Sequence, residues 1–593
     1  MRRRWRGLGL LLLVGLLMSG CAGGGGRAER MCTVVFEDNP QLRFTRQTCQ
    51  VPAGSDLTTT VRVPVGWRID SVSYEPAVIS PARASDGHYE DLTLTLQHVR
   101  YPVLVRIEVA PDYTTRYAWN DGSGTVLTRS ETGNRLRFNT LPYDQQLSRE
   151  GWLPIGWNTG ADGSGTHIGF GSRVDHRGTQ ELTLYCEWLP CTPEDTFDYH
   201  LTEDGAIVTG CRATETVVIP EHLGGAPVVG IAAGSFGDVS LEVLALPPTL
   251  QFIEAKAFRS LTAERLYLFD GLDEVSDEAF GEVRITQLNI NAQRDPVYCG
   301  SYFDTLSEKL DYLYTLREER KLVLFCGSSA RFGYDSPALE AAFPDYRVVN
   351  MGVYAYANML PQAMLVQQYM GAGDILLSSP ELDAIRTQFC GETALDAETF
   401  AMMESNYDML ALLDCRSFTG IFDAFAAYQR ARQGMTARSY DDIPAWFDED
   451  GQRRETLTYN RSGDYILHRE ANLDGRLFGV KRACYNARYI REEDWDGLNR
   501  VYDGFADRGV RVFFTYSPRS RFSITDDSDA SSIAALDAAF RSRLHAPVIS
   551  SIESSLMDAV YFYGTDNHLT SAGVALHTAQ VIEDLRRALE VVP

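Results

Sequence analysis

Two serines in the middle of the chain and an aspartate–histidine pair near its end are the residues best suited by type and spacing to do chemistry. The serines lie in GSSARFG at residues 327–333, and the pair lies in TDNHLTSAG at residues 565–573. A serine hydroxyl becomes an effective nucleophile when a base takes its proton and a third group orients that base. We therefore predict a catalytic triad, whose members in chain order are Ser329, Asp566 and His568.

The residues around the serines predict an α/β sheet. The apolar run at residues 322–326 is typical of a buried strand, and the glycine and serines after it mark a turn from strand to helix. Catalytic groups of open α/β sheets lie at the carboxyl ends of strands. The spacing to Gly333 favours Ser329 as nucleophile, with Ser328 as the alternative. Further apolar runs that alternate with helical segments predict a doubly wound, mostly parallel sheet with strands at residues 347–353, 375–378 and 510–516.

The same residues resemble a known family. GSSARFG resembles the first block of SGNH/GDSL-type hydrolases, G-D-S-x-x-x-G, with Ser328 in place of the aspartate, and TDNHLTSAG resembles the last block. The resemblance extends over residues 300–593, with a mostly helical insert at about 390–483. It implies a flavodoxin-like, three-layer α/β domain that performs acyl-ester chemistry without a metal or a diffusible cofactor. It also implies that the backbone N–H groups of Ser329 and Ala355 stabilise the oxyanion.

The chain departs from this family at two further places. Ala355 stands where the second block has glycine, and DILLSSPE at residues 374–381 lacks the asparagine of the third block. One side-chain oxyanion donor is therefore missing or replaced. The D-alanine-transfer protein of lipoteichoic acid synthesis and the alginate O-acetyltransferases also lack some of these blocks, and the former has a similar GSS turn. The resemblance leaves hydrolysis and acyl transfer open, on ester groups of an extracellular glycan or cell-wall polymer.

The first residues predict export. Residues 1–21 have a basic head, an apolar run shorter than the ~20 residues that span a bilayer, and the sequence MSGC, which resembles a bacterial lipobox. The resemblance implies lipid modification of Cys21, and the Gly-rich residues 22–30 then form a tether. An ordinary signal peptide is the alternative. We expect an extracytoplasmic protein held at the surface of the bacterial cell membrane.

Composition narrows the choice of partners. A formal net charge of −25 argues against a nucleic-acid partner, because binding to phosphates requires positive charge. It also disfavours long-range capture of a polyanion. Export permits disulfides among the ten cysteines that follow Cys21, but their spacing does not fix a connectivity. Neither C-x-x-C pairs nor histidine clusters indicate a metal site.

Short stretches of alternating polar and apolar residues predict β structure for residues 31–192. Residues 149–157 and 182–188 resemble a Listeria–Bacteroides type surface repeat. Their tryptophans either fill a small core or form a platform on which a carbohydrate stacks.

Residues 196–295 contain an internal repeat. Phe236, Phe258 and Phe280 are spaced 22 residues apart, as are Leu244, Leu266 and Leu288. This period predicts a short leucine-rich solenoid with one short strand per turn, and the pattern resembles the BspA-like type. Such a segment serves either as a spacer or as a face that binds a protein or host ligand.

Together these observations predict a multidomain cell-surface lipoprotein with N-terminal β modules, a leucine-rich solenoid and a C-terminal SGNH-like serine esterase or O-acyltransferase. The rival hypothesis is a non-catalytic adhesion or scaffold protein whose C-terminal domain keeps the fold without the activity.

Overall fold

The structure is a computed structural model of the 593-residue chain. It describes residues 30–39, 41–80, 89–132, 137–176, 179–298, 303–354, 357–390, 395–433, 435, 459–460, 462–466, 469 and 482–591. The predicted signal peptide with Cys21, most of the tether, and Ala355 lie outside the described residues. The protein is mixed α/β, rich in sheets and multidomain.

The chain divides into two compact units. The N-terminal unit comprises Met1–Ala118, Gly124–Phe138 and Asp175–Leu184, and the C-terminal unit comprises Trp119–Ser123, Asn139–Val174 and Tyr185–Pro593. No helix in the described part of either unit is long and apolar enough to cross a membrane.

The N-terminal unit consists of β-sheets. One sheet has the order β2-β4-β7-β6 and another the order β3-β1-β8, while β9 pairs with both β5 and β10. Alternate side chains of β7, including Leu92, Leu94 and Leu96, point into a shared core, as the alternating pattern predicts. The strands are β1 (Met31–Phe36), β2 (Arg43–Phe44), β3 (Thr48–Pro52), β4 (Ser55–Pro64), β5 (Trp67–Val72), β6 (Ala77–Ser80), β7 (Tyr89–Val99), β8 (Val103–Val105), β9 (Ile107–Ala118) and β10 (Val126–Thr132).

Two tryptophans of the predicted surface repeat are buried in the C-terminal unit. Trp157 belongs to β12 (Trp152–Asn158), which pairs with β13 (His167–Ile168) and with residues 185–190 of β15 (Glu181–Pro190). The indole N–H of Trp157 donates to the carbonyl oxygen of Leu141, and that of Trp188 donates to Trp119. These two rings therefore fill a core and do not form an open stacking platform.

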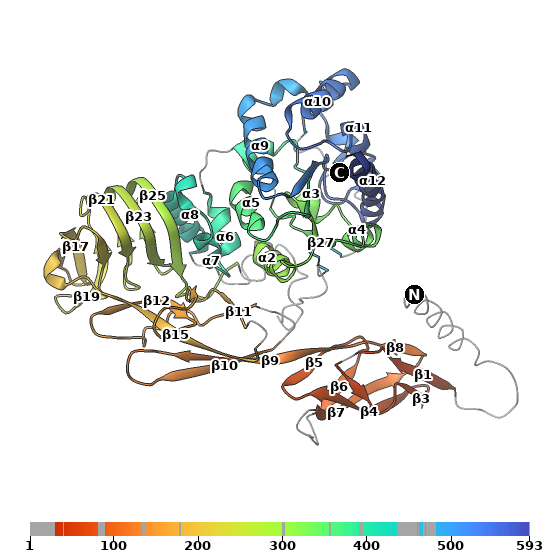
Figure 1. Ribbon diagram of the computed structural model, residues 1–593, viewed down its shortest axis with the longest axis horizontal. Coiled ribbons are helices and arrows are strands. Elements are labelled where there is room, and N and C mark those ends of the chain that lie inside the picture. Colours follow the sequence, from red (N-terminus) through yellow and green to blue (C-terminus); the bar gives the residue numbers. More distant parts are fainter. Residues whose placement is uncertain are drawn as a thin grey trace, which may run out of the picture. The chain divides into compact units, whose positions relative to one another are not determined.

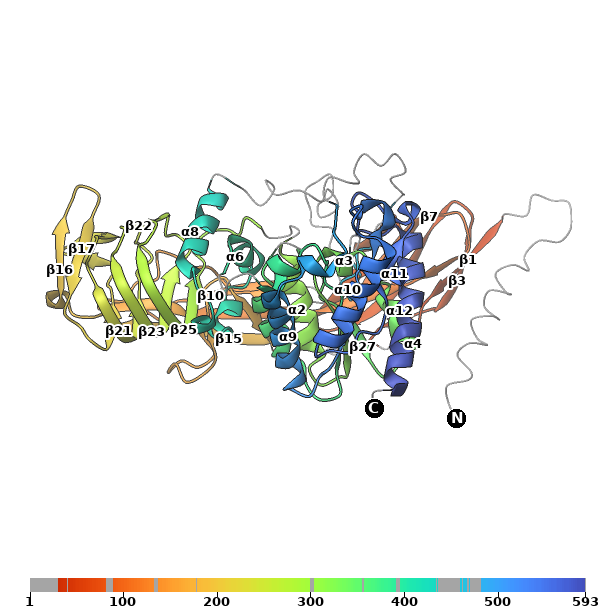
Figure 2. The same cartoon turned by 90° about the horizontal axis from the view of Figure 1, so that it is seen from above.

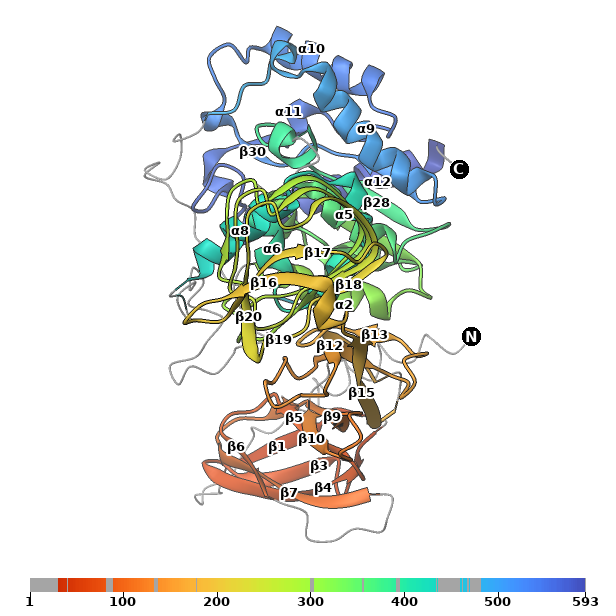
Figure 3. The same cartoon turned by 90° about the vertical axis from the view of Figure 1, so that its left-hand side faces the viewer.

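The 22-residue repeat winds into a parallel stack. Leu244 lies opposite Leu266, which lies opposite Leu288, so the sequence period equals the strand register. Each turn supplies two strands where one was predicted, because a second ladder aligns Ile231, Ile253 and Val275. The turns overlap when the molecule is viewed as in Figure 3. The first ladder contains β18 (Thr216–Val218), β21 (Gly237–Ala245), β23 (Phe258–Phe269) and β25 (Phe280–Asn291), and the second contains β20 (Ala226–Ile231), β22 (Phe252–Ile253) and β24 (Glu274–Val275).

A column of phenylalanines continues from the repeats into the predicted insert. The rings of Phe236, Phe258 and Phe280 stack at centroid distances of 4.5 and 4.8 Å, and Phe422 stacks on Phe280 at 3.6 Å. Phe422 belongs to α8 (Ile421–Arg432), which lies beside β25 (Figure 1). Because the end of a repeat stack exposes apolar residues, α8 acts as its cap.

The second half of the C-terminal unit is built on a parallel sheet with helices on both faces. Its order is β27-β26-β28-β29. Val323 and Phe325 share a core with α5 and α9, whereas Leu322 and Leu324 pack with α4 and α12. In Figure 2, α9 lies on one side of β27, and α4 and α12 lie on the other. The elements are β26 (Lys321–Phe325), β27 (Arg347–Asn350), β28 (Ile375–Ser378), β29 (Arg511–Phe514), α2 (Thr305–Thr315), α4 (Ser336–Ala342), α5 (Met359–Gln367), α9 (Glu492–Ala506), α10 (Ala530–Arg543) and α12 (Ser571–Val591).

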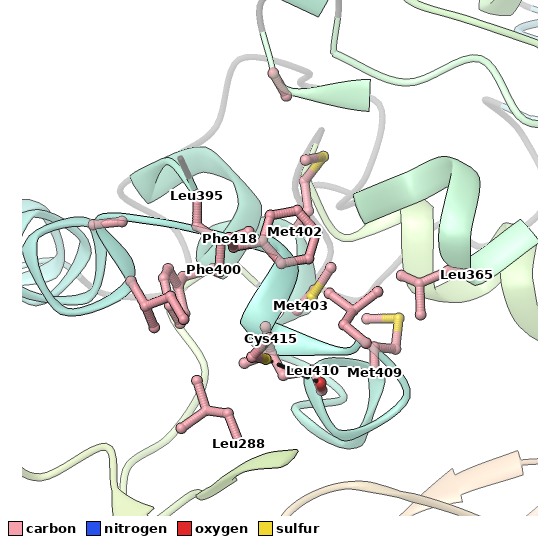
Figure 4. Close-up of a cluster of buried hydrophobic side chains, with 14 of the residues drawn as sticks. Leu288, Leu365, Leu395, Phe400, Met402, Met403, Met409, Leu410, Cys415 and Phe418 are labelled. Atoms are coloured by element: carbon pink, nitrogen blue, oxygen red, sulfur yellow. Dashed lines mark hydrogen bonds between the residues drawn. The ribbon is translucent and has the colours of Figure 1, made fainter. Parts of the chain in front are cut away.

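One hydrophobic core joins the repeats to this sheet. Leu288 of β25 and Leu365 of α5 belong to the same cluster as side chains of α6 (Ala397–Met403) and α7 (Asp408–Ala411) (Figure 4). The cysteines that the structure describes are free thiols: Cys32, Cys49, Cys186, Cys191, Cys211, Cys326, Cys415 and Cys484.

Candidate active site

The two serines lie at the carboxyl end of β26, in the one-turn helix α3 (Ser328–Arg331). Cys326, the residue between strand and turn, has a φ of 155°, which marks a sharp change of direction. A side chain at Gly333 would meet the carbonyl oxygen of Ser329 at 2.3 Å. The glycine of GSSARFG is therefore required for the chain to pass close behind the serines.

His568 reaches the serines from the loop that precedes α12. Its backbone N–H donates to Thr565 Oγ1 at 3.1 Å, and its carbonyl oxygen accepts a 2.8 Å hydrogen bond from the N–H of Tyr563. The imidazole stacks on Phe332 with centroids 4.2 Å apart. These contacts hold Nε2 at 2.9 Å from Ser328 Oγ. The histidine thus contacts the alternative nucleophile and not Ser329.

Ser329 has different partners. Its Oγ accepts a 3.0 Å hydrogen bond from Asn567 Nδ2, and its N–H donates to Glu381 Oε1 at 2.7 Å. The prediction that this N–H serves the oxyanion therefore needs correction, because a carboxylate already occupies it. Ser329 lies one residue further into α3 than Ser328 and is fully buried.

Glu381 is the residue of this site that the sequence analysis missed. It follows β28 and is only 2% exposed, and its Oε2 accepts a 2.6 Å hydrogen bond from Gln388 Nε2. Burial raises the pKa of Glu381, and the hydrogen bonds from Ser329 and Gln388 oppose that shift. It occupies the stretch where the SGNH pattern has its third-block asparagine. The signal was present in SSPE, the last four residues of DILLSSPE, directly after a predicted strand.

Asp566 is near the site but faces another cation. Its Oδ2 lies 3.6 Å from Nη2 of Arg519, and its carbonyl oxygen accepts a hydrogen bond from the N–H of Ser520. Among the described residues, His568 has no hydrogen bond to Asp566. The structure therefore brings His568 to Ser328, and among the described residues it shows no hydrogen bond from His568 to either of the other predicted triad members, Ser329 and Asp566.

The charges around His568 are positive. Burial and the nearby guanidinium groups of Arg469 and Arg331 lower the pKa of His568 to about 3. The imidazole is thus neutral at physiological pH and can accept a proton from a hydroxyl.

Part of the predicted insert is fixed against this site. Asp464 accepts hydrogen bonds from the N–H and Oγ of Ser336, from Asn350 Nδ2 and from Asn460 Nδ2, at 2.7 to 2.8 Å. The next N–H, that of Tyr465, donates to the carbonyl oxygen of Arg331. Residues 459–466 therefore cover the turn after the serines.

In the described ranges, no group of three or more His, Cys, Asp or Glu side chains is arranged to hold a metal ion.

The comparisons with known proteins add no relative to this description. No protein-family model matches the chain, and no curated protein matches it.

Proposed function

We propose that the C-terminal half of the chain is an SGNH-like serine esterase or O-acyltransferase that uses Ser328 and His568. The observation that carries this proposal is the 2.9 Å contact between Ser328 Oγ and His568 Nε2 at the carboxyl end of a parallel sheet. A hydroxyl in contact with a neutral imidazole is the minimal pair for acyl transfer through a covalent intermediate.

The Ser328–His568 pair defines the steps of the proposed acyl transfer. His568 takes the proton of Ser328 while Oγ forms a bond to the ester carbonyl carbon, and the carbonyl oxygen becomes an oxyanion. The bond to the leaving alcohol then breaks, and the imidazolium returns its proton to that alcohol. Water or a sugar hydroxyl next attacks the acyl-serine, with His568 again as the base. The acyl group ends on water in hydrolysis or on the acceptor in transfer.

In this proposal Ser329 and Glu381 are positioning residues. Ser329 is held by Asn567, the neighbour of His568, and by Glu381 from the end of β28. These bonds hold α3 against both the loop of His568 and the end of β28. They therefore fix the distance between Ser328 Oγ and His568 Nε2.

The cellular setting is part of the same proposal. The signal-like residues 1–21 support an extracytoplasmic lipoprotein anchored through Cys21, acting on an extracellular glycan or cell-wall polymer. The repeats would then act as a leucine-rich spacer or as a face for a protein or host ligand.

One observation favours the rival, a non-catalytic adhesion or scaffold protein. Asp566 is paired with Arg519, and the N–H of Ser329 is held by Glu381, so two elements of the expected machinery have other partners. The two functions differ in whether any serine of the site is reactive.

Labelling with a fluorophosphonate probe tests the choice. We expect the wild type and Ser329→Ala to label, and Ser328→Ala and His568→Ala to remain unlabelled, with circular dichroism confirming that each variant is folded. Labelling that survives Ser328→Ala and disappears in Ser329→Ala would move the nucleophile to Ser329. A folded wild type that neither labels nor hydrolyses 4-nitrophenyl butyrate supports the scaffold.

A further inference from the structure

Arg469 is a buried cation with hydrogen-bond donors that the described residues do not use. Its side chain is 5% exposed, and its Nε and Nη1 have no hydrogen-bond partner in the part of the chain that the structure describes. Burial lowers the pKa of Arg469. Because buried donors are nearly always paired in folded proteins, and a buried charge without a partner is costly, this arginine needs an explanation.

Arg469 lies one aromatic ring away from the catalytic base. Its guanidinium carbon is 5.5 Å from the ring centroid of Phe332 and 5.1 Å from that of Tyr465. Phe332 also stacks on the imidazole of His568 at 4.2 Å. The aromatic rings hold the guanidinium in place without using its N–H groups.

The neighbouring carboxylates are committed elsewhere. Asp464 attracts Arg469 electrostatically, but its oxygens accept hydrogen bonds from Ser336, Asn350 and Asn460. Glu381 accepts from Ser329 and Gln388. The Nε and Nη1 donors of Arg469 are therefore not used by the described carboxylates, and a carboxylate on a bound ligand could accept hydrogen bonds from them.

Arg331 is a second buried cation near the site. Its Nε donates to the carbonyl oxygen of Gly352 at 3.2 Å, and Lys309 Nζ donates to the same oxygen at 2.6 Å. Burial and the charge of Arg331 lower the pKa of Lys309, which disfavours the charged form of this lysine. The guanidinium groups of Arg331 and Arg469 therefore supply positive charge at the site although the whole chain carries a net charge of −25. The distant negative charges are screened beyond a Debye length of roughly 8 Å, whereas a buried contact is not.

We infer that Arg469 binds a carboxylate on the substrate, next to the ester that Ser328 attacks. This inference rests on the proposed function and names the substrate class: an ester that carries one carboxylate near its acyl carbon. The guanidinium supplies planar N–H donors for the carboxylate oxygens, and the low exposure of the site strengthens the pair. A single anionic group suffices, so the inference does not require capture of a polyanion.

A matched pair of esters tests the inference. We expect the wild type to hydrolyse the 4-nitrophenyl monoester of glutaric acid with a higher kcat/KM than 4-nitrophenyl butyrate. Arg469→Met should lower the first value by about 10- to 100-fold, the range for loss of a charge-assisted hydrogen bond, and lower the second value by much less. Arg469→Lys keeps the positive charge but lacks the planar set of N–H donors of a guanidinium. Its kcat/KM for the glutaric acid monoester should therefore lie between the values of the wild type and of Arg469→Met. Equal losses for both esters would assign Arg469 a purely structural role and overturn the inference.

Binding of non-reactive analogues separates this inference from the catalytic proposal. N-(4-nitrophenyl)glutaramic acid and N-(4-nitrophenyl)butanamide replace the ester by an amide, and calorimetric titration measures their affinities without turnover. We expect the wild type to prefer the acid and Arg469→Met to lose that preference. Equal affinities in the wild type overturn the carboxylate site even if Ser328 labels. A retained preference in a protein that fails to label supports the carboxylate site and overturns the catalytic proposal alone.

Thermal stability gives a third, independent readout. Among the described residues, Nε and Nη1 of Arg469 have no hydrogen-bond partner, so burial of this guanidinium should cost stability. Arg469→Met keeps an apolar side chain against Phe332 and Tyr465 and should therefore keep or raise Tm. A clear fall in Tm would indicate that the arginine stabilises the fold and would contradict the inference.

Discussion

The catalytic proposal depends at the residue scale on which atoms meet at the end of β26. The side-chain types in GSSARFG and TDNHLTSAG predicted that a serine and a histidine would come together, and the structure places them at hydrogen-bond distance. The choice between Ser328 and Ser329 depends on the rotation of a single helical turn. The pairing of Asp566 with Arg519 depends on a strand that lies far away in the sequence. Neither contact leaves a local signal in the sequence.

The low pKa of His568 predicts an unusual pH profile. The base works only when neutral, so activity should be present above its pKa of about 3 and be lost as pH falls through that value. The rate of fluorophosphonate labelling should therefore stay level from about pH 8 to about pH 5, where an ordinary histidine with a pKa near 6.5 would already be protonated. Arg469→Met removes one of the positive charges that lower the pKa and should move the acidic limb upward. If the labelling rate of the wild type instead fell near pH 6.5, burial and the nearby guanidinium groups would not lower the pKa of His568 as described.

Local patterns predicted the elements unevenly. The apolar runs gave β26 to β29 within a few residues, because a strand buried on both faces needs an uninterrupted hydrophobic segment. The period of 22 residues predicted the register of the long ladder, because residues one period apart lie opposite each other on neighbouring strands. Ile231, Ile253 and Val275 also recur every 22 residues, but they were not predicted to form strands, because β22 and β24 contribute two residues each and have no detectable alternation. The capping role of α8 could not be predicted either, since it depends on a tertiary contact with β25.

The stacking of Phe422 on Phe280 predicts a large effect of one substitution in α8. Phe422→Ala would remove a buried ring and uncover the last ring of the column, which should lower the free energy of unfolding by about 3–5 kcal/mol. Phe522→Ala is the matched control, because Phe522 is 69% exposed and should change stability by no more than about 0.5 kcal/mol. Urea denaturation monitored by circular dichroism measures both. Equal effects of the two substitutions would show that α8 does not cap the repeats.

On the scale of the whole molecule, the repeats and the parallel sheet belong to one compact unit. The sequence predicted a boundary between residues 295 and 300, where the repeat pattern ends and a helix begins. The structure instead has a single hydrophobic cluster that extends across this point. A sequence period marks where a pattern stops, but it carries no information on whether the next element packs against it.

Arg432 provides a test of that unity. It pairs with Asp270 of the repeats at 3.0 Å and with Glu404, which follows α6, at 3.1 Å, and all three are buried. Arg432→Met leaves two buried carboxylates without their cation, which should cost about 3–5 kcal/mol. Scanning calorimetry should show the transition of the whole C-terminal unit move to lower temperature.

Arg416→Met serves as the control, because Arg416 pairs with Asp414 at an exposed position and such pairs contribute about 0–1 kcal/mol. If Arg432→Met splits the melting curve so that only the repeats unfold early, the two parts are independent domains and the shared core is not cooperative.

The phenylalanine column also determines how this protein could change in length. Because α8 occupies the terminal position on the last turn, a repeat added after residue 291 would have to displace the helix and its ring. A repeat duplicated inside the stack, for example residues 244–265, would keep the register on both sides and add one ring to the column. Evolutionary lengthening or protein engineering would therefore have to insert turns inside the stack. Each inserted turn would place α8 and the parallel sheet one turn further from the first repeat.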